Sequence, residues 1–333
     1  MPVPSPRRLL FIAAAVVALL VASVAVAGAT TSSKSATPQL KVALIAPSAH
    51  NDLAFTQSMY SALKQLQTKY NFKLSVSENQ FVVADAANIM RQYAAEGYNL
   101  IIAHGSQYGG TIQALAPKYP KVSFAWGTAS STFGLPNVYA YQAASNEGGY
   151  VQGYLGELIS KTKVVGVIGP VAVGDAKLYV DGFKAGALAA NPKATVHVSY
   201  TGSFSDPSLM SKQATQYLAE KVDVLTGSSQ SVVGAITVAK QNNVAWFGTQ
   251  WSQASLAPKQ VVSSQVYDWR GMLTKVFTGI KAGKLGGSSY TINLINGGEK
   301  IQYNPGYALS ASLKAKAQKV ITAIQKGSIK APK

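Results

Sequence analysis

The sequence predicts an α/β protein with two doubly wound lobes, each a parallel sheet covered by helices. From residue 40 onward, short apolar runs alternate with amphipathic stretches, a pattern typical of βαβ units. The pattern of residues 41–47 starts again at residues 163–170, so the chain contains two such series in succession. A chain of 333 residues is long enough to bury both cores.

The elements of the first lobe follow from the spacing of its apolar residues. Continuous apolar runs predict buried strands, whereas Leu63, Leu66 and Tyr70 lie at helical spacing. Gly97 and Pro120 interrupt the pattern where elements end. The predicted strands are residues 41–45, 72–76, 100–103 and 122–126, and the predicted helices are residues 57–70, 84–96 and 109–118.

The second lobe repeats this plan, and a helix over residues 147–160 is expected to bridge the lobes. The later strands are predicted at residues 163–170, 195–200, 223–225, 244–247, 261–266 and 290–294, and the later helices at 176–190, 207–218, 232–241, 269–282 and 310–325. Lobe 1 is thus expected to hold residues 40–143 plus 267–285, and lobe 2 residues 144–266 plus 286–333. Hinge crossings are expected near residues 142–145, 264–267 and 286–289, since a few loop residues can absorb a rotation between lobes.

The first 29 residues are typical of a secretory signal peptide. Arg7 and Arg8 precede an apolar run over residues 9–27, and small residues at 25–29 offer cleavage sites. An uncleaved anchor is the alternative, because the run approaches the ~20 residues that span a bilayer. Residues 30–39 are predicted to form a flexible leader. We therefore expect an exported protein, in a periplasm or at the outer face of the cytoplasmic membrane.

Composition excludes several classes of site. The chain has no Cys, which excludes disulfides, thiolate metal sites, a Cys nucleophile and a lipid-modified Cys. Three scattered His make a metal site unexpected. The net charge of +17 reflects 30 basic against only 13 acidic residues. The bases are dispersed, and their densest run, between Lys314 and Lys333, is typical of a solvated helix face and tail. Nucleic acid is therefore not an expected partner.

The loops that follow the predicted strands are where a ligand is expected, because doubly wound lobes bind ligands at the carboxyl ends of their strands. These loops are rich in amides, hydroxyls and aromatic rings and poor in charge, which predicts a neutral planar or polyhydroxylated ligand. His50 and His104 lie in two of them and are interpreted as structural. The loops span residues 50–58, 104–110, 201–207, 226–231 and 248–253.

An enzyme is not expected. The sequence contains no Gly-x-Ser-x-Gly elbow, no phosphate-binding Gly loop with Lys-Ser/Thr, and no dinucleotide Gly pattern after the first strand. No cofactor is expected either. A nucleoside-processing enzyme is the weaker alternative.

Over residues 40–307 the chain resembles the basic membrane protein family, through segments whose order and spacing match along the whole length. These segments are NDLAFTQ (51–57), AAEGYNLIIAHG (94–105), NEGGYVQGYLGELISKTKVVGVIG (146–169), DGFKAGALAANP (181–192), TGSFSDP (201–207) and APKQVVSSQVYDW (257–269). The resemblance implies a type I periplasmic-binding fold with a multi-strand hinge. It also implies a monomeric substrate-binding protein that serves the membrane permease of an ABC importer. A sensory module of the same fold is the alternative.

The resemblance further implies a purine ring clamped between Phe55 and Phe204. The family's ribose-binding Asp is matched by Gln250, a characteristic Lys by Tyr267, and another acid by Thr128. Because an amide binds hydroxyls more weakly than a carboxylate does, a free base such as adenine is expected rather than a nucleoside. Residues 267–269 look like the family's adenine-associated subgroup, although Asp268 is equally interpreted as a helix cap.

The expected site is assembled from the crevice loops and the family resemblance together. Its residues are Asp52, Phe55, Thr56, Gln57, Ser106, Gln107, Trp126, Phe204, Ser228, Gln250, Trp251, Tyr267, Asp268 and Trp269.

Overall fold

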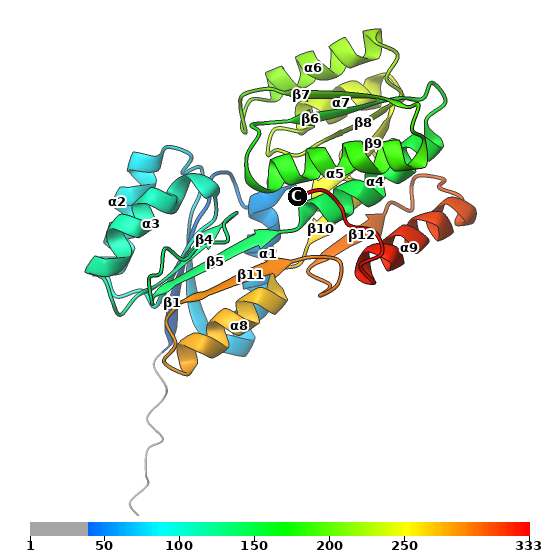
Figure 1. Ribbon diagram of the computed structural model, residues 1–333. Helices are drawn as coiled ribbons and strands as arrows, with labels where there is room; N and C mark the ends of the chain where they lie inside the picture. Colours follow the sequence, from blue (N-terminus) through cyan, green and yellow to red (C-terminus); the bar gives the residue numbers. More distant parts are fainter. Residues whose placement is uncertain (1–38) are drawn as a thin grey trace, which may run out of the picture. The chain divides into compact units, whose positions relative to one another are not determined.

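The computed structural model describes residues 39–333 and confirms the two-lobed α/β architecture (Figure 1). Each lobe is built on a six-stranded sheet. The predicted signal peptide and residues 30–38 of the predicted leader lie outside the described residues. Within residues 39–333, none of the helices combines the length and apolar character needed to cross a membrane.

Lobe 1 is a parallel sheet with the strand order β11-β5-β4-β3-β1-β2. Alternate residues of its strands serve two cores. Val42 and Leu44 of β1 pack with α1 and α8, whereas Ala43 and Ile45 pack with α2 and α3. The strands are β1 (Leu40–Ile45), β2 (Phe72–Ser77), β3 (Leu100–Ala103), β4 (Ser123–Gly127), β5 (Val138–Ala143) and β11 (Ser288–Ile292), and the helices are α1 (Phe55–Tyr70), α2 (Val83–Ala95), α3 (Gly109–Leu115) and α8 (Arg270–Lys281).

Lobe 2 has the strand order β12-β10-β9-β8-β6-β7, in which β12 is antiparallel to β10 and the other pairs are parallel. Helices α4, α5 and α9 share one core with this sheet, and α6 and α7 share another. The strands are β6 (Val164–Gly169), β7 (Thr195–Tyr200), β8 (Val224–Gly227), β9 (Ala245–Gln250), β10 (Val261–Tyr267) and β12 (Glu299–Tyr303), and the helices are α4 (Ser145–Ile159), α5 (Gly174–Ala190), α6 (Pro207–Ala219), α7 (Val233–Gln241) and α9 (Ala311–Gln325).

Helices α4 and α5 pack with their backbones in contact. A Cβ atom on Gly153 would lie 1.9 Å from the carbonyl oxygen of Phe183, and one on Gly186 would lie 2.0 Å from that of Tyr150. Only glycine fits such an approach without displacing the neighbouring backbone. The two helices are therefore held as one tightly packed pair.

The connections between the lobes correct the predicted domain boundaries. Within residues 39–333, the chain crosses between β5 and α4, between β10 and α8, and between β11 and β12. The predicted crossing at residues 286–289 is wrong, because β11 pairs with β5 in register Ser288↔Tyr139 and so belongs to lobe 1. The second crossing follows Tyr267, since β10 keeps its pairing with β12 up to that residue.

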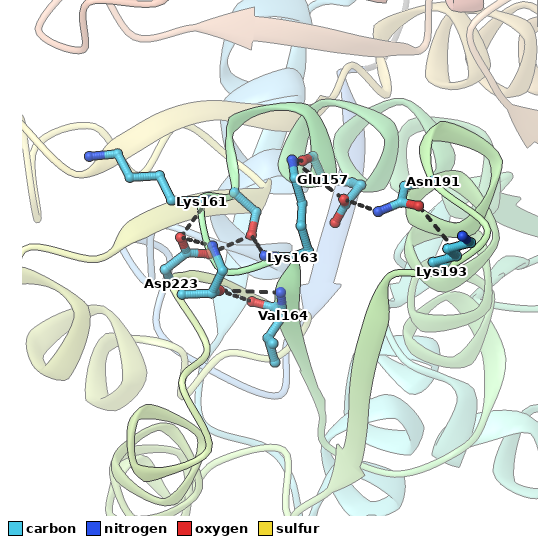
Figure 2. A network of polar contacts seen from close by, with 9 residues as sticks. Glu157, Lys161, Lys163, Val164, Asn191, Lys193 and Asp223 are labelled. Atoms are coloured by element: carbon cyan, nitrogen blue, oxygen red, sulfur yellow. Dashed lines mark hydrogen bonds and ion pairs between the residues drawn. The ribbon is translucent and has the colours of Figure 1, made fainter.

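A polar network connects the carboxyl end of α4 to neighbouring segments of lobe 2 (Figure 2). The Asp223 carboxylate accepts hydrogen bonds from the Ser160 hydroxyl at 2.6 Å and from the backbone N–H groups of Lys161 at 2.7 Å and Thr162 at 3.1 Å. Glu157 accepts a hydrogen bond from the Asn191 amide at 2.8 Å. These contacts tie α4 to the loop before β8 and to the end of α5.

Candidate functional site

A cavity lies between the carboxyl ends of the strands of the two lobes. Lobe 1 contributes residues from the loops that follow β1 to β4, and lobe 2 contributes residues from the loops that follow β6 to β9. The lining residues are Pro47, Phe55, Phe81, Gly105, Ser106, Gln107 and Thr128 from lobe 1, and Val173, Gly174, Asp175, Ala176, Phe204, Gln230 and Gln250 from lobe 2.

The Phe55 ring forms a wall of the cavity that is supported from behind. It stacks on the imidazole of His104, with ring centres 3.7 Å apart and planes 7° from parallel. His104 Nε2 lies 3.0 Å from the Phe55 carbonyl oxygen, and Nδ1 lies 2.8 Å from the Tyr141 hydroxyl. Burial lowers the pKa of His104 to about 3, so the imidazole is neutral. His104 is thus the structural residue that the sequence predicts.

Phe204 lines the cavity from lobe 2, where it meets a second aromatic ring that the sequence did not predict. The rings of Phe204 and Phe81 lie 6.1 Å apart at 46°, so they touch across the two lobes. Phe81 is 41% exposed and begins an exposed apolar run with Val82 and Val83. That run follows β2, a loop left out of the predicted site, and an exposed Phe-Val-Val after a polar stretch is the sequence signal that could have revealed it.

Four polar side chains of the cavity have atoms without hydrogen-bond partners among residues 39–333. They are Gln107, Asp175, Gln230 and Gln250. Buried polar groups are normally paired, and an unpaired one costs free energy. A ligand that supplies donors and acceptors would satisfy these groups. Gln107 and Gln250 were expected here, whereas Asp175 and Gln230 were not.

Asp175 is the one ionisable side chain among the described residues that line the cavity. It lies in the first turn of α5 and is 3% exposed. Burial raises the pKa of its carboxyl to about 7. The nearby backbone N–H of Ala143 favours the carboxylate and so opposes part of this rise. Asp175 is therefore partly protonated near neutral pH.

Three of the expected ligand-binding residues instead position Phe55. The Asp52 carboxylate accepts hydrogen bonds from the backbone N–H groups of Ala54, Thr56 and Gln57 and from the Ser48 hydroxyl. The hydroxyl of Thr56 lies 2.7 Å from that of Ser48, and the amide oxygen of Gln57 accepts from the backbone N–H of Leu53. These bonds satisfy donors at the start of α1, where N–H groups lack helical partners.

The expected residues at 267–269 lie away from the cavity. Trp269 is buried in the core of lobe 1, where its indole N–H donates to the Ser58 hydroxyl at 2.8 Å. Asp268 accepts from the backbone N–H of Arg270 and pairs with the side chains of Arg270 and Lys300. The hydrogen bonds from Arg270 lower the pKa of Asp268 to about 2. β10 continues to Tyr267 within lobe 2. The chain then contacts α1 through Trp269, and residues 267–269 are not among those that line the cavity.

The remaining expected residues take other positions. Trp126 donates to the carbonyl oxygen of Ser106 at 3.3 Å and stacks on Phe133, so it supports the cavity loop from behind. Ser228 is buried directly after β8. Trp251 and Tyr267 line a separate hollow that also includes Asp268. Among the predicted site residues, the structure thus brings Phe55, Ser106, Gln107, Phe204 and Gln250 together at the cavity.

The chain is similar to known proteins in sequence and in fold. The chain is 30% identical over 233 residues to a purine-binding protein of Brucella abortus (strain 2308), a match that covers 69% of this chain and 66% of that protein, just under two thirds of its length. It is 25% identical over 269 residues to basic membrane protein A2 of Borrelia garinii subsp. bavariensis, covering 79% of this chain and 76% of that protein. A solved solute-binding protein of an ABC transporter system from Conexibacter woesei has the same fold, with a TM-score of 0.73 at 23% identity over 88% of this chain and 98% of that chain.

The family model described as ABC transporter substrate-binding protein, PnrA-like, matches residues 39–332, nearly all of the described chain. Its members are solute-binding proteins and not enzymes. The chain therefore belongs to the basic membrane protein family of ABC transporter substrate-binding proteins.

Proposed function

We propose that this protein captures a free purine base, such as adenine, between its two lobes and delivers it to the permease of an ABC importer. Members of the family act outside the cytoplasm. The observation that carries the proposal is the cavity itself, in which aromatic rings from both lobes stand beside four unpaired polar side chains. A flat heterocycle with donors and acceptors around its rim matches both features.

The aromatic walls support a planar ligand. One face of Phe55 is covered by His104, so a ligand can stack on the opposite side of the ring, which lines the cavity. Phe204 lies on the other lobe and is half-buried, in contact with Phe81. Rotation of the lobes about the three crossings would bring Phe204 over a ligand that is already stacked on Phe55.

Gln250 supports a free base over a nucleoside. It stands where the family resemblance places a ribose-binding Asp, and its buried amide oxygen has no hydrogen-bond partner among the described residues. Its backbone has φ of 68°, a left-handed conformation that costs energy for a residue other than glycine and that is often found at ligand sites. A carboxylate would bind two vicinal hydroxyls by charge-assisted hydrogen bonds, whereas this amide provides weaker ones. The Brucella relative named as purine-binding is consistent with the same ligand class.

Calorimetric titration tests this function. The mature protein would be unfolded, dialysed to remove co-purified ligand, refolded and titrated with adenine, guanine, adenosine and guanosine. We expect binding of at least one free base that is tighter than binding of its nucleoside. Tight nucleoside binding with weak base binding would contradict the proposal, and so would a co-purified ligand that mass spectrometry identifies as a nucleoside.

A further inference from the structure

Asp175 is a buried acidic residue that lines the cavity. The residue is only 3% exposed, and neither of its carboxyl oxygens has a hydrogen-bond partner among residues 39–333. Its backbone is held firmly, since the Ser145 hydroxyl donates to the Asp175 carbonyl oxygen at 2.5 Å. A buried carboxyl on a fixed backbone that lines an otherwise uncharged cavity is positioned to contact the ligand.

The surroundings of Asp175 favour the neutral acid. The titratable groups that face it are Tyr141 of β5, Tyr267 of β10 and Glu299 of β12, which are all buried and none of which is a cation. His104, next to Tyr141, is neutral. Lys177 on the same helix pairs with Asp181 instead. A carboxylate without a cationic partner is poorly tolerated in such a site, and a ligand that excludes the remaining water would disfavour it further.

A protonated carboxyl offers one O–H donor next to one carbonyl acceptor, whereas an ionised carboxylate only accepts. Adenine presents the complementary pair, because its exocyclic amine donates and the adjacent ring nitrogen accepts. Guanine has an edge with two adjacent donors, a ring N–H and an amine, which an ionised carboxylate can bind. The protonation state of one carboxyl therefore distinguishes the two kinds of edge.

Given the purine site proposed above, we infer that Asp175 is a specificity-determining residue that binds the base as a neutral carboxylic acid. It donates its O–H to a ring nitrogen and accepts a hydrogen bond from the adjacent amine, and so it selects an adenine-type edge. Phe55 and Phe204 stack on the faces of the base, and Asp175 forms hydrogen bonds with its edge.

The test is the pH dependence of base binding by the ligand-free protein, measured by equilibrium dialysis with adenine and with guanine between about pH 5.5 and about pH 8.5. Burial places the pKa of Asp175 at about 7. Above that pH the adenine complex must take up a proton, so we expect its affinity to fall about tenfold for each further pH unit. Guanine affinity is expected to hold or to rise over the same range.

Two variants assign the effect. Asp175→Asn keeps one donor and one acceptor without a titration, so it should still bind adenine but with an affinity that no longer changes with pH. Asp85→Asn makes the same change at an exposed position in the first turn of α2 and should leave both affinity and pH dependence unchanged. Because the wild-type pH profile needs no substitution, a variant that fails to fold does not remove the test.

The outcomes separate this inference from the proposed function. Adenine binding that is independent of pH, a parallel loss of guanine affinity, or an unchanged pH profile in Asp175→Asn would overturn the role of Asp175 while leaving a purine receptor in place. Failure to bind any purine at any pH would overturn the proposed function itself.

Discussion

The contact between Phe55 and His104 shows how a single buried imidazole can fix one wall of the cavity. The imidazole is hydrogen-bonded at both nitrogens and packs face to face on the phenyl ring, so the ring has little freedom to rotate away from the cavity. Because burial keeps His104 neutral, the stack does not change over the physiological pH range. Phe204 meets the ring of Phe81 at a tilt, and no aromatic ring among the described residues stacks face to face on it.

This difference predicts the effect of replacing the ring of Phe55. Phe55→Leu keeps an apolar side chain in the core of lobe 1 but removes the aromatic face, so it should weaken purine binding by about 1–3 kcal/mol, the magnitude of base–aromatic stacking. Calorimetry at a fixed pH measures this loss. Phe133→Leu is the matched control, because Phe133 stacks on Trp126 outside the lining of the cavity. Equal affinities for both variants would refute the stacking role.

At the scale of elements, the beginning of α1 is organised by the carboxylate of Asp52. Its three backbone hydrogen bonds satisfy donors that the helix itself cannot pair, and they hold the turn from which Phe55 enters the cavity. Asp52 does not line the cavity, and the contacts that the structure shows for it are those that shape the loop.

Removal of that carboxylate should affect stability and binding together. We expect Asp52→Ala to lower the free energy of unfolding by about 0.5–2 kcal/mol, as for the loss of a side chain that binds helix N–H groups. We also expect weaker purine binding, although Asp52 does not line the cavity. Urea denaturation and calorimetry measure the two effects. Asp52→Asn, which retains an acceptor, should recover most of both, and a variant that lost stability without losing affinity would contradict this positioning role.

The elements show which features the sequence could predict. Helices such as α1 and α9 were found because amphipathic spacing is a local property, and buried strands such as β1 because their apolar runs are continuous. Strand β5 was missed, since Tyr139, Tyr141 and Gln142 break the apolar pattern. The position of β11 was predicted approximately but its lobe was not, because pairing with β5 joins segments that are far apart in the chain.

The candidate site was predictable to the same degree. Phe55 and Phe204 follow from family resemblance and from polar loops at strand ends. Asp175 lies in the first turn of α5, and the loop between β6 and α5 lacks the amides and aromatic rings by which the sequence marks the other loops. Its importance depends on burial and on the absence of a partner among the described residues, which are properties of the packed molecule and not of the sequence.

For the whole molecule, acidic residues are scarce, so a few buried carboxyl groups have a large influence on how the free energy of unfolding changes with pH. Burial raises the pKa of Asp175 to about 7 and raises that of Glu299 well above its ordinary value. Each group therefore binds a proton in the folded protein that the unfolded chain releases. The stability from this difference is complete below the unfolded pKa values and is lost as the pH rises through the folded ones.

We accordingly expect the ligand-free protein to lose about 1–2 kcal/mol of unfolding free energy between about pH 6.5 and about pH 8. His104 opposes this trend only at lower pH, because its lowered pKa contributes stability above about 6.5 that is lost on acidification. Urea denaturation across this pH range measures the change. Asp175→Asn should reduce the slope, and stability that increases with pH in this window would contradict the assignment.

The glycine contacts between α4 and α5 have a mechanical consequence. Helix α4 begins at Ser145, immediately after the first crossing between the lobes, and α5 begins at Gly174, next to Asp175. Backbone contact along the helices and the hydrogen bond from Ser145 to Asp175 leave little room for one helix to slide on the other. The amino-terminal ends of the two helices therefore meet at one place, where Asp175 at the cavity is held against Ser145 at the first crossing, and we expect these two residues to move together when the lobes rotate.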